Sequence, residues 1–316
     1  MADIVLQVRD FTGRYSGLNG TFRIPVSLRT YLRAALTIGF QNGAVARKAS
    51  RPLREYRLNS ARGQFGLFYD VSGGLCLHPS YHQIESSEKG ALTFRHAAIV
   101  AKIVAEQHMQ IPWLANVDEM RRQGRLTINE TTNERGDYVG LDQAGAWHVF
   151  EAKGRSGGID GSLLAAAKSQ ASRIEIVDEV APHTRSACVT DLGANPITAT
   201  LVDPPPQGSS RKSIRFSRDD FAQFYYGNVA NYIRAFGEQV RVDGLPEYSW
   251  ASIRGIDEAL PEAIRAADVY LGLPTRIVHA PRIGMQETRL VLELESPYAG
   301  LDQIALAGRM PDWQVM

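Results

Sequence analysis

The chain has 316 residues, of which 44% are hydrophobic and 22% are charged, as in an ordinary globular domain. Its formal net charge is only +1, so the protein has no positive electrostatic potential over its whole surface. Any nucleic-acid-binding surface has to be local. No apolar run approaches the roughly 20 residues that a membrane span needs, and the N-terminus lacks the apolar segment of a signal peptide. Cys76 and Cys188 have no metal-type spacing, so we expect buried thiols in a reducing cytoplasm.

Hydrophobic periodicity and turn residues predict the secondary structure in chain order. Before the middle of the chain we expect strands over 4–8 and 22–26, a helix over 28–40, a strand–turn–strand unit over 64–77, and a helix over 93–109 that resumes over 113–122. After the middle we expect strands over 186–190 and 197–202, helices over 218–236 and 256–271, and a strand over 288–294.

Three consecutive prolines at 204–206, followed by Gln-Gly-Ser-Ser, form the clearest linker. We therefore divide the chain into an N-terminal α+β region over 1–90, a central core over 91–203, and a C-terminal α+β region over 204–316. The roles of the outer regions stay open, with target recognition, dimerisation and docking to a partner as alternatives. No GxxxxGK[ST] sequence occurs, so an ATP-driven step would belong to another subunit.

The segment 136–154, GDYVGLDQAGAWHVFEAKG, is the most informative part of the sequence. Two short β-type runs, 138–141 and 146–152, flank turn residues that include Gly145, which predicts a β-hairpin. Asp137 enters the first strand and Glu151 lies near the end of the second. Antiparallel pairing would bring the two carboxylates together although thirteen residues separate them.

Lys153 lies two residues beyond Glu151, so on an extended strand both side chains point to the same face. Two carboxylates at one end of a sheet offer the hard oxygen ligands that Mg²⁺ prefers. A metal ion there would lower the pKa of a bound water, and an ammonium group would stabilise developing negative charge or orient that water. Phosphodiester hydrolysis requires such a set.

A helix is predicted over 162–173, directly after the hairpin and a Gly-containing connection. Leu163, Ala166, Ala167 and Gln170 recur at helical spacing, so we expect them to share the face turned toward the sheet. A glutamine on a buried face needs a partner, which a metal-bound water or a substrate phosphate would supply. A neighbouring residue such as Arg173 is the alternative partner.

Asp137, a hairpin, Glu151-Ala152-Lys153 and then a helix with Gln170 resemble the PD-(D/E)XK nuclease superfamily, which includes restriction, repair and phage-defence nucleases. The resemblance covers about 130–202, less than a third of the chain. It implies a restriction-endonuclease-like α/β fold, in which a mixed central sheet contains the hairpin and is flanked by helices. Gly136 stands where the family name has proline, a position at which proline is often absent.

The resemblance also implies roles for individual residues. Asp137 and Glu151 would bind Mg²⁺ or Mn²⁺ together with the carbonyl of Ala152, and Lys153 would assist the attacking water. Gln170 would be the polar residue that several branches carry on this helix. Some branches add a glutamate from a preceding helix, and four are available here: Glu106, Glu119, Glu130 and Glu134.

Simpler interpretations exist for each of these features. The hairpin could carry an ordinary surface Glu–Lys pair, although the apolar residues around it favour a buried strand, where such a pair stabilises poorly. His78 and His82 suggest a zinc site, but Pro79 interrupts the helix that would align them, and no second ligand pair is evident. Arginines gather in three clusters, which could follow a phosphate backbone or be solvated: Arg51, Arg54 and Arg57; Arg121, Arg122 and Arg125; Arg211, Lys212, Arg215 and Arg218.

The sequence thus predicts a cytoplasmic Mg²⁺-dependent nuclease that acts on nucleic acid, with DNA and endonuclease action favoured only through the family resemblance. A catalytically silent nucleic-acid-binding or assembly subunit on a nuclease-like fold is the alternative. The complete Asp and ExK set argues against it. A partner protein or a homodimer is compatible with both functions, and no membrane association is expected.

Overall fold

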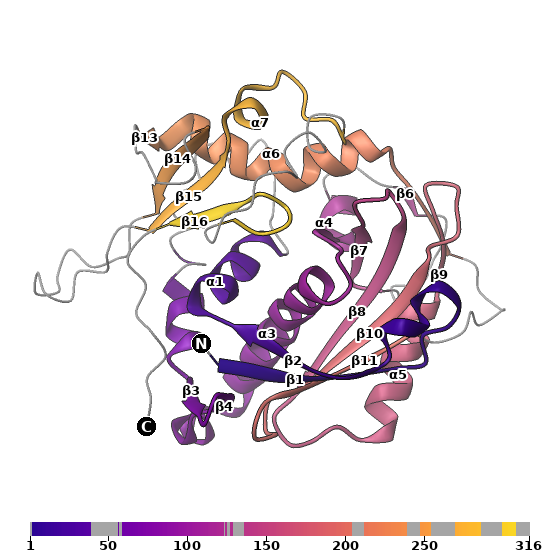
Figure 1. Ribbon diagram of the computed structural model, residues 1–316, viewed down its shortest axis with the longest axis vertical. Helices are drawn as coiled ribbons and strands as arrows, with labels where there is room; N and C mark the ends of the chain where they lie inside the picture. Colours follow the sequence, from indigo (N-terminus) through magenta and orange to yellow (C-terminus); the bar gives the residue numbers. More distant parts are fainter. Residues whose placement is uncertain are drawn as a thin grey trace, which may run out of the picture.

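The computed structural model describes residues 2–38, 56, 59–122, 124, 127–128, 136–203, 212–238, 247–253, 269–285 and 299–307. A mixed sheet of nine strands runs through the lower part of the molecule in Figure 1. In pairing order its strands are β3 (Phe68–Val71), β4 (Gly74–Leu77), β1 (Ala2–Arg9), β11 (Thr198–Val202), β10 (Thr184–Asp191), β8 (Trp147–Arg155), β7 (Tyr138–Leu141) and β5 (Trp113–Asn116), and β2 (Gly20–Val26) pairs with β1.

The centre of this sheet combines antiparallel and parallel pairing. Strands β5, β7 and β8 form an antiparallel meander, and helix α5 (Gly161–Ser172) then crosses to β10, which is parallel to β8. Strand β11 returns antiparallel to β10 and lies parallel to β1. The strands of the first 90 residues therefore belong to the same sheet as the hairpin, and the boundary proposed near residue 90 runs within that sheet.

Helices cover both faces of the central strands (Figure 1). Helix α3 (Ser86–Gln107) packs on the face that carries Gly154, because a Cβ atom at Gly154 would lie 2.7 Å from the carbonyl oxygen of Thr93 and 2.9 Å from Ala97 Cβ. Only glycine permits this close approach. Helix α5 packs on the other face, where Ala167 and Ala171 cluster with side chains of β10.

Smaller elements complete the N-terminal and central regions. Helix α1 (Leu28–Thr37) lies beside α3, and α4 (Val117–Arg122) directly follows β5. Two 3-10 turns connect strands or precede α3, namely η1 (Gly13–Leu18) and η2 (Pro79–Gln83). A three-stranded sheet contains β6 (Thr127–Ile128), β12 (Lys212–Arg215) and β9 (Ile174–Val177).

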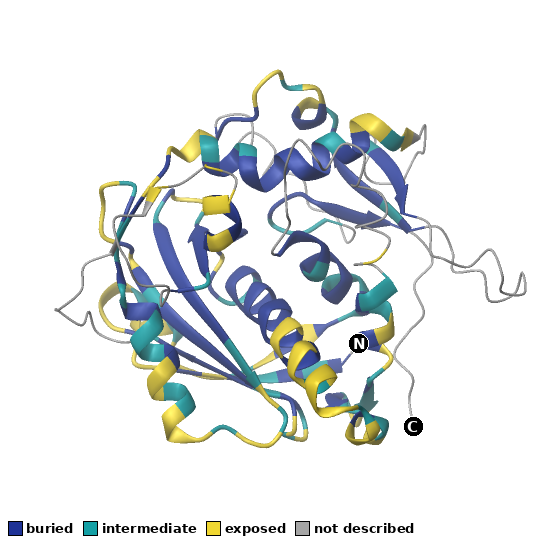
Figure 2. Ribbon diagram, turned by 180° about the vertical axis from the view of Figure 1, so that it is seen from behind, coloured by how far each residue is buried: buried dark blue, intermediate teal, exposed yellow. Residues whose placement is uncertain are grey.

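The C-terminal region forms a third layer across the top of Figure 1. Its described elements are α6 (Arg218–Phe236), α7 (Thr275–His279) and the sheet β13 (Gly237–Glu238), β14 (Tyr248–Ile253), β15 (Val269–Pro274) and β16 (Ala305–Ala307). Buried side chains of α1, α3, α6 and the strands belong to one hydrophobic cluster, and the inward-facing segments are correspondingly buried in Figure 2. The three predicted regions thus share one core.

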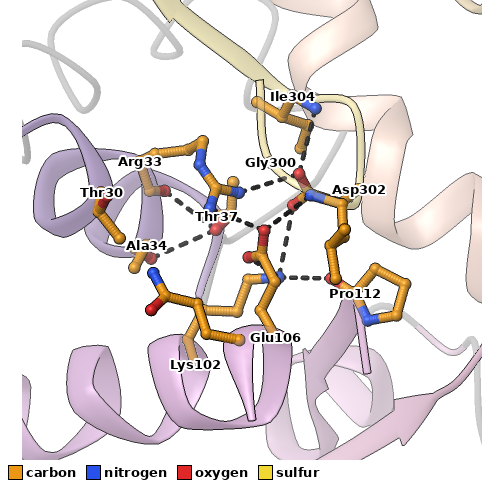
Figure 3. Close-up of polar contacts among 12 residues, drawn as sticks. Thr30, Arg33, Ala34, Thr37, Lys102, Glu106, Pro112, Gly300, Asp302 and Ile304 are labelled. Atoms are coloured by element: carbon orange, nitrogen blue, oxygen red, sulfur yellow. Dashed lines mark hydrogen bonds and ion pairs between the residues drawn. The ribbon is translucent and has the colours of Figure 1, made fainter. Parts of the chain in front are cut away.

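A buried ionic network ties the C-terminal layer to the helices below it (Figure 3). Arg33 of α1 contacts Glu106 of α3 at 2.8 Å and Asp302 at 3.0 Å. Lys102 of α3, which has no exposed surface, lies 3.4 Å from each of the same two carboxylates. The hydroxyl group of Tyr225 in α6 donates a hydrogen bond to Asp302 at 2.6 Å. The network therefore contains two positive and two negative side chains, which neutralise each other. Buried charges without such partners would strongly destabilise the fold.

Most elements expected from the sequence are confirmed where the structure describes them, but three assignments are wrong. Residues 113–116 are strand β5 and not helix, so only 117–122 are helical, and 64–67 form the end of a helix and a turn. The last part of the predicted helix 256–271 is strand β15. The rest of that helix, the strand at 288–294 and the proline linker at 204–210 lie outside the described residues.

Both cysteines are buried and unpaired thiols, as the sequence predicts. Within the described ranges, no helix combines the length and the apolar character that crossing a bilayer would require.

Candidate active site

The predicted hairpin is present, and its turn has the expected chemistry. Strand β7 covers the predicted residues, and β8 begins at Trp147 and extends to Arg155. Asp142 closes the turn by accepting a hydrogen bond from the backbone N–H of Ala146 at 2.7 Å, and Gly145 has a φ of 85°. Tyr138 pairs with Phe150, which places Asp137 and Glu151 side by side at the open end.

Asp137 and Glu151 are joined by reciprocal hydrogen bonds to backbone groups. The backbone N–H of Asp137 donates to Glu151 Oε2 at 3.1 Å, and the N–H of Ala152 donates to Asp137 Oδ2 at 3.2 Å. Each carboxylate is therefore held by the main chain beside the other one. The convergence predicted from the hairpin register is confirmed.

Lys153 lies on the same face as Glu151, as the strand period predicts. Its Nζ atom is 2.5 Å from Glu151 Oε1, a close charge contact rather than a well-aligned hydrogen bond. Glu151 is fully buried, whereas the Lys153 side chain retains about a third of its exposure (31%). The ammonium group thus connects the buried carboxylate with the surface.

The electrostatics of this pair are unusual for a glutamate. Burial, reinforced by the negative charge of Asp137, raises the pKa of Glu151 to about 8, although Lys153 acts in the opposite direction. With both carboxyl groups ionised, this poorly solvated place would hold more negative charge than one lysine balances, which is why the charged form of Glu151 is disfavoured. A bound cation would relieve this excess.

The face of the sheet that carries Glu151 and Lys153 is the one covered by α5. Glu151 and Lys153 are register partners of Ala187 and Val189 in β10, and those two side chains cluster with Ala167 of α5. Side chains of register partners share a face of the sheet. Helix α5 therefore covers the strand positions that carry the ExK residues.

Gln170 lies on α5 and is partly buried, and its Oε1 atom is buried without a hydrogen-bond partner among the described residues. This agrees with the expected unsatisfied glutamine, and Arg173 does not supply a bond to that atom. The predicted face of α5 is wrong in one position, because Ala166 is exposed. Ala167 and Ala171 are the fully buried alanines of this helix.

The donor set fits a divalent metal ion. Asp137 and Glu151 offer neighbouring carboxylate oxygens, the type of ligand that such an ion prefers. In the part of the chain that the structure describes, no three His, Cys, Asp or Glu side chains gather around one point. Such a two-carboxylate site suits Mg²⁺, which usually retains several water ligands.

The structure describes two of the four upstream glutamates, Glu106 and Glu119. Glu106 belongs to the buried network with Arg33 and Lys102, and Glu130 and Glu134 lie outside the described residues. Glu119 of α4 is 4% exposed and lines the same cleft as Asp137. It lies 2.7 Å from Arg122.

Residue Asn116 connects Glu119 with the hairpin. Its side-chain oxygen accepts a hydrogen bond from the Glu119 backbone N–H at 2.9 Å, and its side chain also contacts the Tyr138 hydroxyl. The N–H of Val117 donates to the carbonyl of Asp137 at 3.0 Å. Sequence reasoning overlooked this link, although an asparagine three residues before an acidic residue is a helix N-cap signal.

A cleft of about 520 Å³ opens beside the site. Its lining includes Asp137 and Tyr138, Glu119 and Arg122 of α4, and Phe94 and Arg95 of α3. Glu151 and Lys153 do not line it, so Asp137 is the point at which the cleft meets the candidate catalytic residues.

Two of the remaining candidates, His78 and Arg218, make structural contacts. His78 accepts a hydrogen bond from the Ser80 N–H and caps η2, in place of the zinc site considered from the sequence. In the arginine clusters, Arg218 donates to the carbonyl of Gly145 at 2.9 Å and so supports the hairpin turn. Arg51, Arg54, Arg57, Arg125 and Arg211 lie outside the described residues.

Comparison with models of known protein families, with curated proteins and with solved structures found no match.

Proposed function

We propose that the protein is a metal-dependent nuclease of the PD-(D/E)XK type that hydrolyses phosphodiester bonds, with DNA as its substrate and endonuclease action of the restriction, repair or phage-defence kind. The observation that carries the proposal is the buried pairing of Asp137 with Glu151, with Lys153 in contact with Glu151. The mixed sheet around the hairpin, with α5 on one face and α3 on the other, supports the restriction-endonuclease-like core that the sequence resembles.

Asp137, Glu151 and the carbonyl of Ala152 would hold Mg²⁺ or Mn²⁺. When bound, such an ion supplies an activated water and positive charge for the phosphate in the transition state. Lys153 extends from the buried carboxylate toward the surface, so its ammonium group can donate to the attacking water or to a phosphate oxygen. Gln170 offers a buried side-chain carbonyl oxygen, without a hydrogen-bond partner among the described residues, that can accept a hydrogen bond from a water.

Glu119 is the upstream glutamate that we assign to this site. It is buried beside Asp137 in the same cleft, and its helix begins at the strand that pairs with β7. Its role would be to hold a water or the metal ion. Glu106 is not assigned, because Arg33 and Lys102 already neutralise it.

The test is cleavage of supercoiled plasmid and of single-stranded DNA with Mg²⁺ or Mn²⁺, comparing wild type with Glu151→Ala and Lys153→Met. Lys168→Met is the matched control, because it removes a lysine that pairs with Asp10 at 2.7 Å and not with Glu151. Positions 168 and 170 lie about 200° apart around the axis of α5. We expect metal-dependent cleavage by wild type and by Lys168→Met, and its loss in the two site variants.

Two results would count against the proposal. Cleavage that persists in Glu151→Ala and Lys153→Met would place the activity elsewhere or in a contaminant. Absence of cleavage together with absence of Mn²⁺ binding at the Asp137–Glu151 pair would favour the catalytically silent binding or assembly subunit. Isothermal titration of wild type and Asp137→Asn with Mn²⁺ measures the second property directly.

A further inference from the structure

The cleft beside Asp137 continues into a second hollow along α3. The second hollow has a volume of about 500 Å³ and extends to Ile84 and Glu88. The two share four lining residues, Tyr56, Ser60, Gln64 and Arg95. They therefore form one groove that begins at Asp137 and follows α3 toward its N-terminus; we call it the α3 groove.

Exposed aromatic side chains are concentrated in this groove. Phe94 is 57% exposed and Tyr56 is 53% exposed, and both line the cleft that ends at Asp137. The other large hydrophobic side chains that are exposed in the described part of the chain are valines, Val71 and Val180. Exposure of a phenylalanine costs free energy in an isolated protein, so two exposed rings beside one cleft indicate a ligand with flat apolar surfaces.

The polar lining includes one guanidinium, that of Arg95, which can contact an anionic ligand. The Arg95 guanidinium donates to Tyr56 Oη at 3.1 Å and to Ser60 Oγ at 2.8 Å, which holds it where the two hollows join. Its charge has no carboxylate partner among the described ion pairs, so it is available to a phosphate. The lining also carries the carboxylates of Glu88, Asp118, Glu119 and Asp137, and a second guanidinium, that of Arg122, pairs with Glu119 at 2.7 Å.

Exposed aromatic rings with a cation nearby suit an unpaired nucleotide strand better than a duplex. In a duplex the faces of the bases are covered by their neighbours, and a side chain cannot stack on them unless a base leaves the helix. In a single strand every base presents a face to an aromatic ring, while the backbone phosphates contact arginine. The duplex major groove is instead read by hydrogen bonds to base edges.

We propose that the α3 groove binds single-stranded nucleic acid, with Phe94 and Tyr56 stacking on bases and Arg95 contacting a phosphate, and that it leads the strand to Asp137. The claim that the groove leads a strand to Asp137 rests on the proposed nuclease function. The claim that the groove binds single strands does not depend on it. The preferred substrate is then unpaired DNA or RNA, or the unpaired end of a duplex.

Binding is tested by fluorescence anisotropy with a labelled oligothymidylate, an RNA of equal length and a blunt duplex, in EDTA so that no strand is cleaved. The variants are Phe94→Ala, Tyr56→Ala and Arg95→Gln, with Val180→Ala as the control for removal of an exposed hydrophobic side chain elsewhere. Because stacking of one base on one ring contributes about 1–3 kcal/mol, we expect each aromatic variant to bind single strands roughly 5- to 150-fold more weakly.

We expect Val180→Ala to bind like wild type, Phe94→Trp to retain binding, and the duplex to bind more weakly than either single strand. The relative affinities of the oligothymidylate and the RNA decide which unpaired strand is preferred. The proposal is overturned if the aromatic variants bind single strands as tightly as wild type, if the duplex binds equally well, or if wild type binds none of the three probes.

Failure of this proposal can be separated from failure of the nuclease proposal. Metal-dependent cleavage that is lost in Lys153→Met but unchanged in Phe94→Ala would support the proposed active site and contradict the proposed role of the groove. Single-strand binding that depends on Phe94, together with absence of cleavage with Mg²⁺ or Mn²⁺, would support the proposed role of the groove and contradict the proposed nuclease function.

Discussion

Replacement of Asp302 by alanine tests the buried network that joins the C-terminal layer to α1 and α3 (Figure 3). Asp302 is fully buried and accepts hydrogen bonds from Arg33 at 3.0 Å, from Tyr225 at 2.6 Å and from the backbone N–H of Ile304 at 3.1 Å. Lys102 lies 3.4 Å from it. Without Asp302 the network would hold two buried cations and one carboxylate.

Removal of one partner from a buried ion pair destabilises a protein by about 3–5 kcal/mol, because the opposite charge remains buried and unbalanced. We therefore expect Asp302→Ala to lower the free energy of unfolding by about that amount. The exposed pair of Asp3 with Arg23, 3.9 Å apart, gives the control, since Asp3→Asn should cost less than about 1 kcal/mol.

Urea unfolding followed by tryptophan fluorescence is the assay. Trp113 is a local reporter, because its Nε1–H donates to the Tyr226 hydroxyl at 2.5 Å, and that hydroxyl donates to the Asp302 carbonyl at 2.8 Å. The double variant Lys102→Met with Asp302→Leu removes one charge of each sign and should recover much of the loss. A loss below about 1 kcal/mol in Asp302→Ala, or no recovery in the double variant, would refute the charge-balance argument.

Three further predictions concern the core and the candidate site. Burial, aided by Arg95, lowers the pKa of His96 from 6.5 to about 3; the unfolded chain therefore takes up a proton below pH 6.5 that the folded protein does not. Protonation of His96 in the unfolded chain therefore does not reduce the folding stability above pH 6.5, but it does so increasingly as the pH falls below that value. Between pH 7.5 and 5.5 the loss should be about 1.4 kcal/mol. The difference in unfolding free energy between wild type and His96→Gln should change by the same amount over this pH range. Gly154→Ala places a Cβ atom 2.7 Å from the Thr93 carbonyl oxygen, so we expect a loss of about 1–3 kcal/mol in urea unfolding, and a neutral variant would contradict the close packing of α3 on β8. Mn²⁺ at 100 times its Kd should stabilise wild type by about 2.7 kcal/mol in thermal unfolding but leave Asp137→Asn unchanged, and equal stabilisation of both would remove Asp137 from the metal site.

Local patterns determined the hairpin and the residues at its end. A turn sequence with Asp142 and Gly145 between two β-type runs specifies its own register, and register alone places Asp137 beside Glu151 and directs Lys153 to the same face. The adjacent helix α5 was equally predictable, because it follows from spacing within a dozen residues. These features depend on neighbours in the chain, which the sequence displays directly.

Long-range packing decided what the sequence could not. Residues 113–116 continue an apolar helical pattern, yet pairing with β7 makes them strand β5, since tertiary contacts override weak local preference. The exclusion of Glu106 from the proposed site depends on distant partners, because Arg33 donates to it from 73 positions away and the Leu301 N–H donates to it at 2.8 Å. The α3 groove likewise joins Tyr56, Phe94 and Asp137, whose proximity no spacing in the sequence encodes.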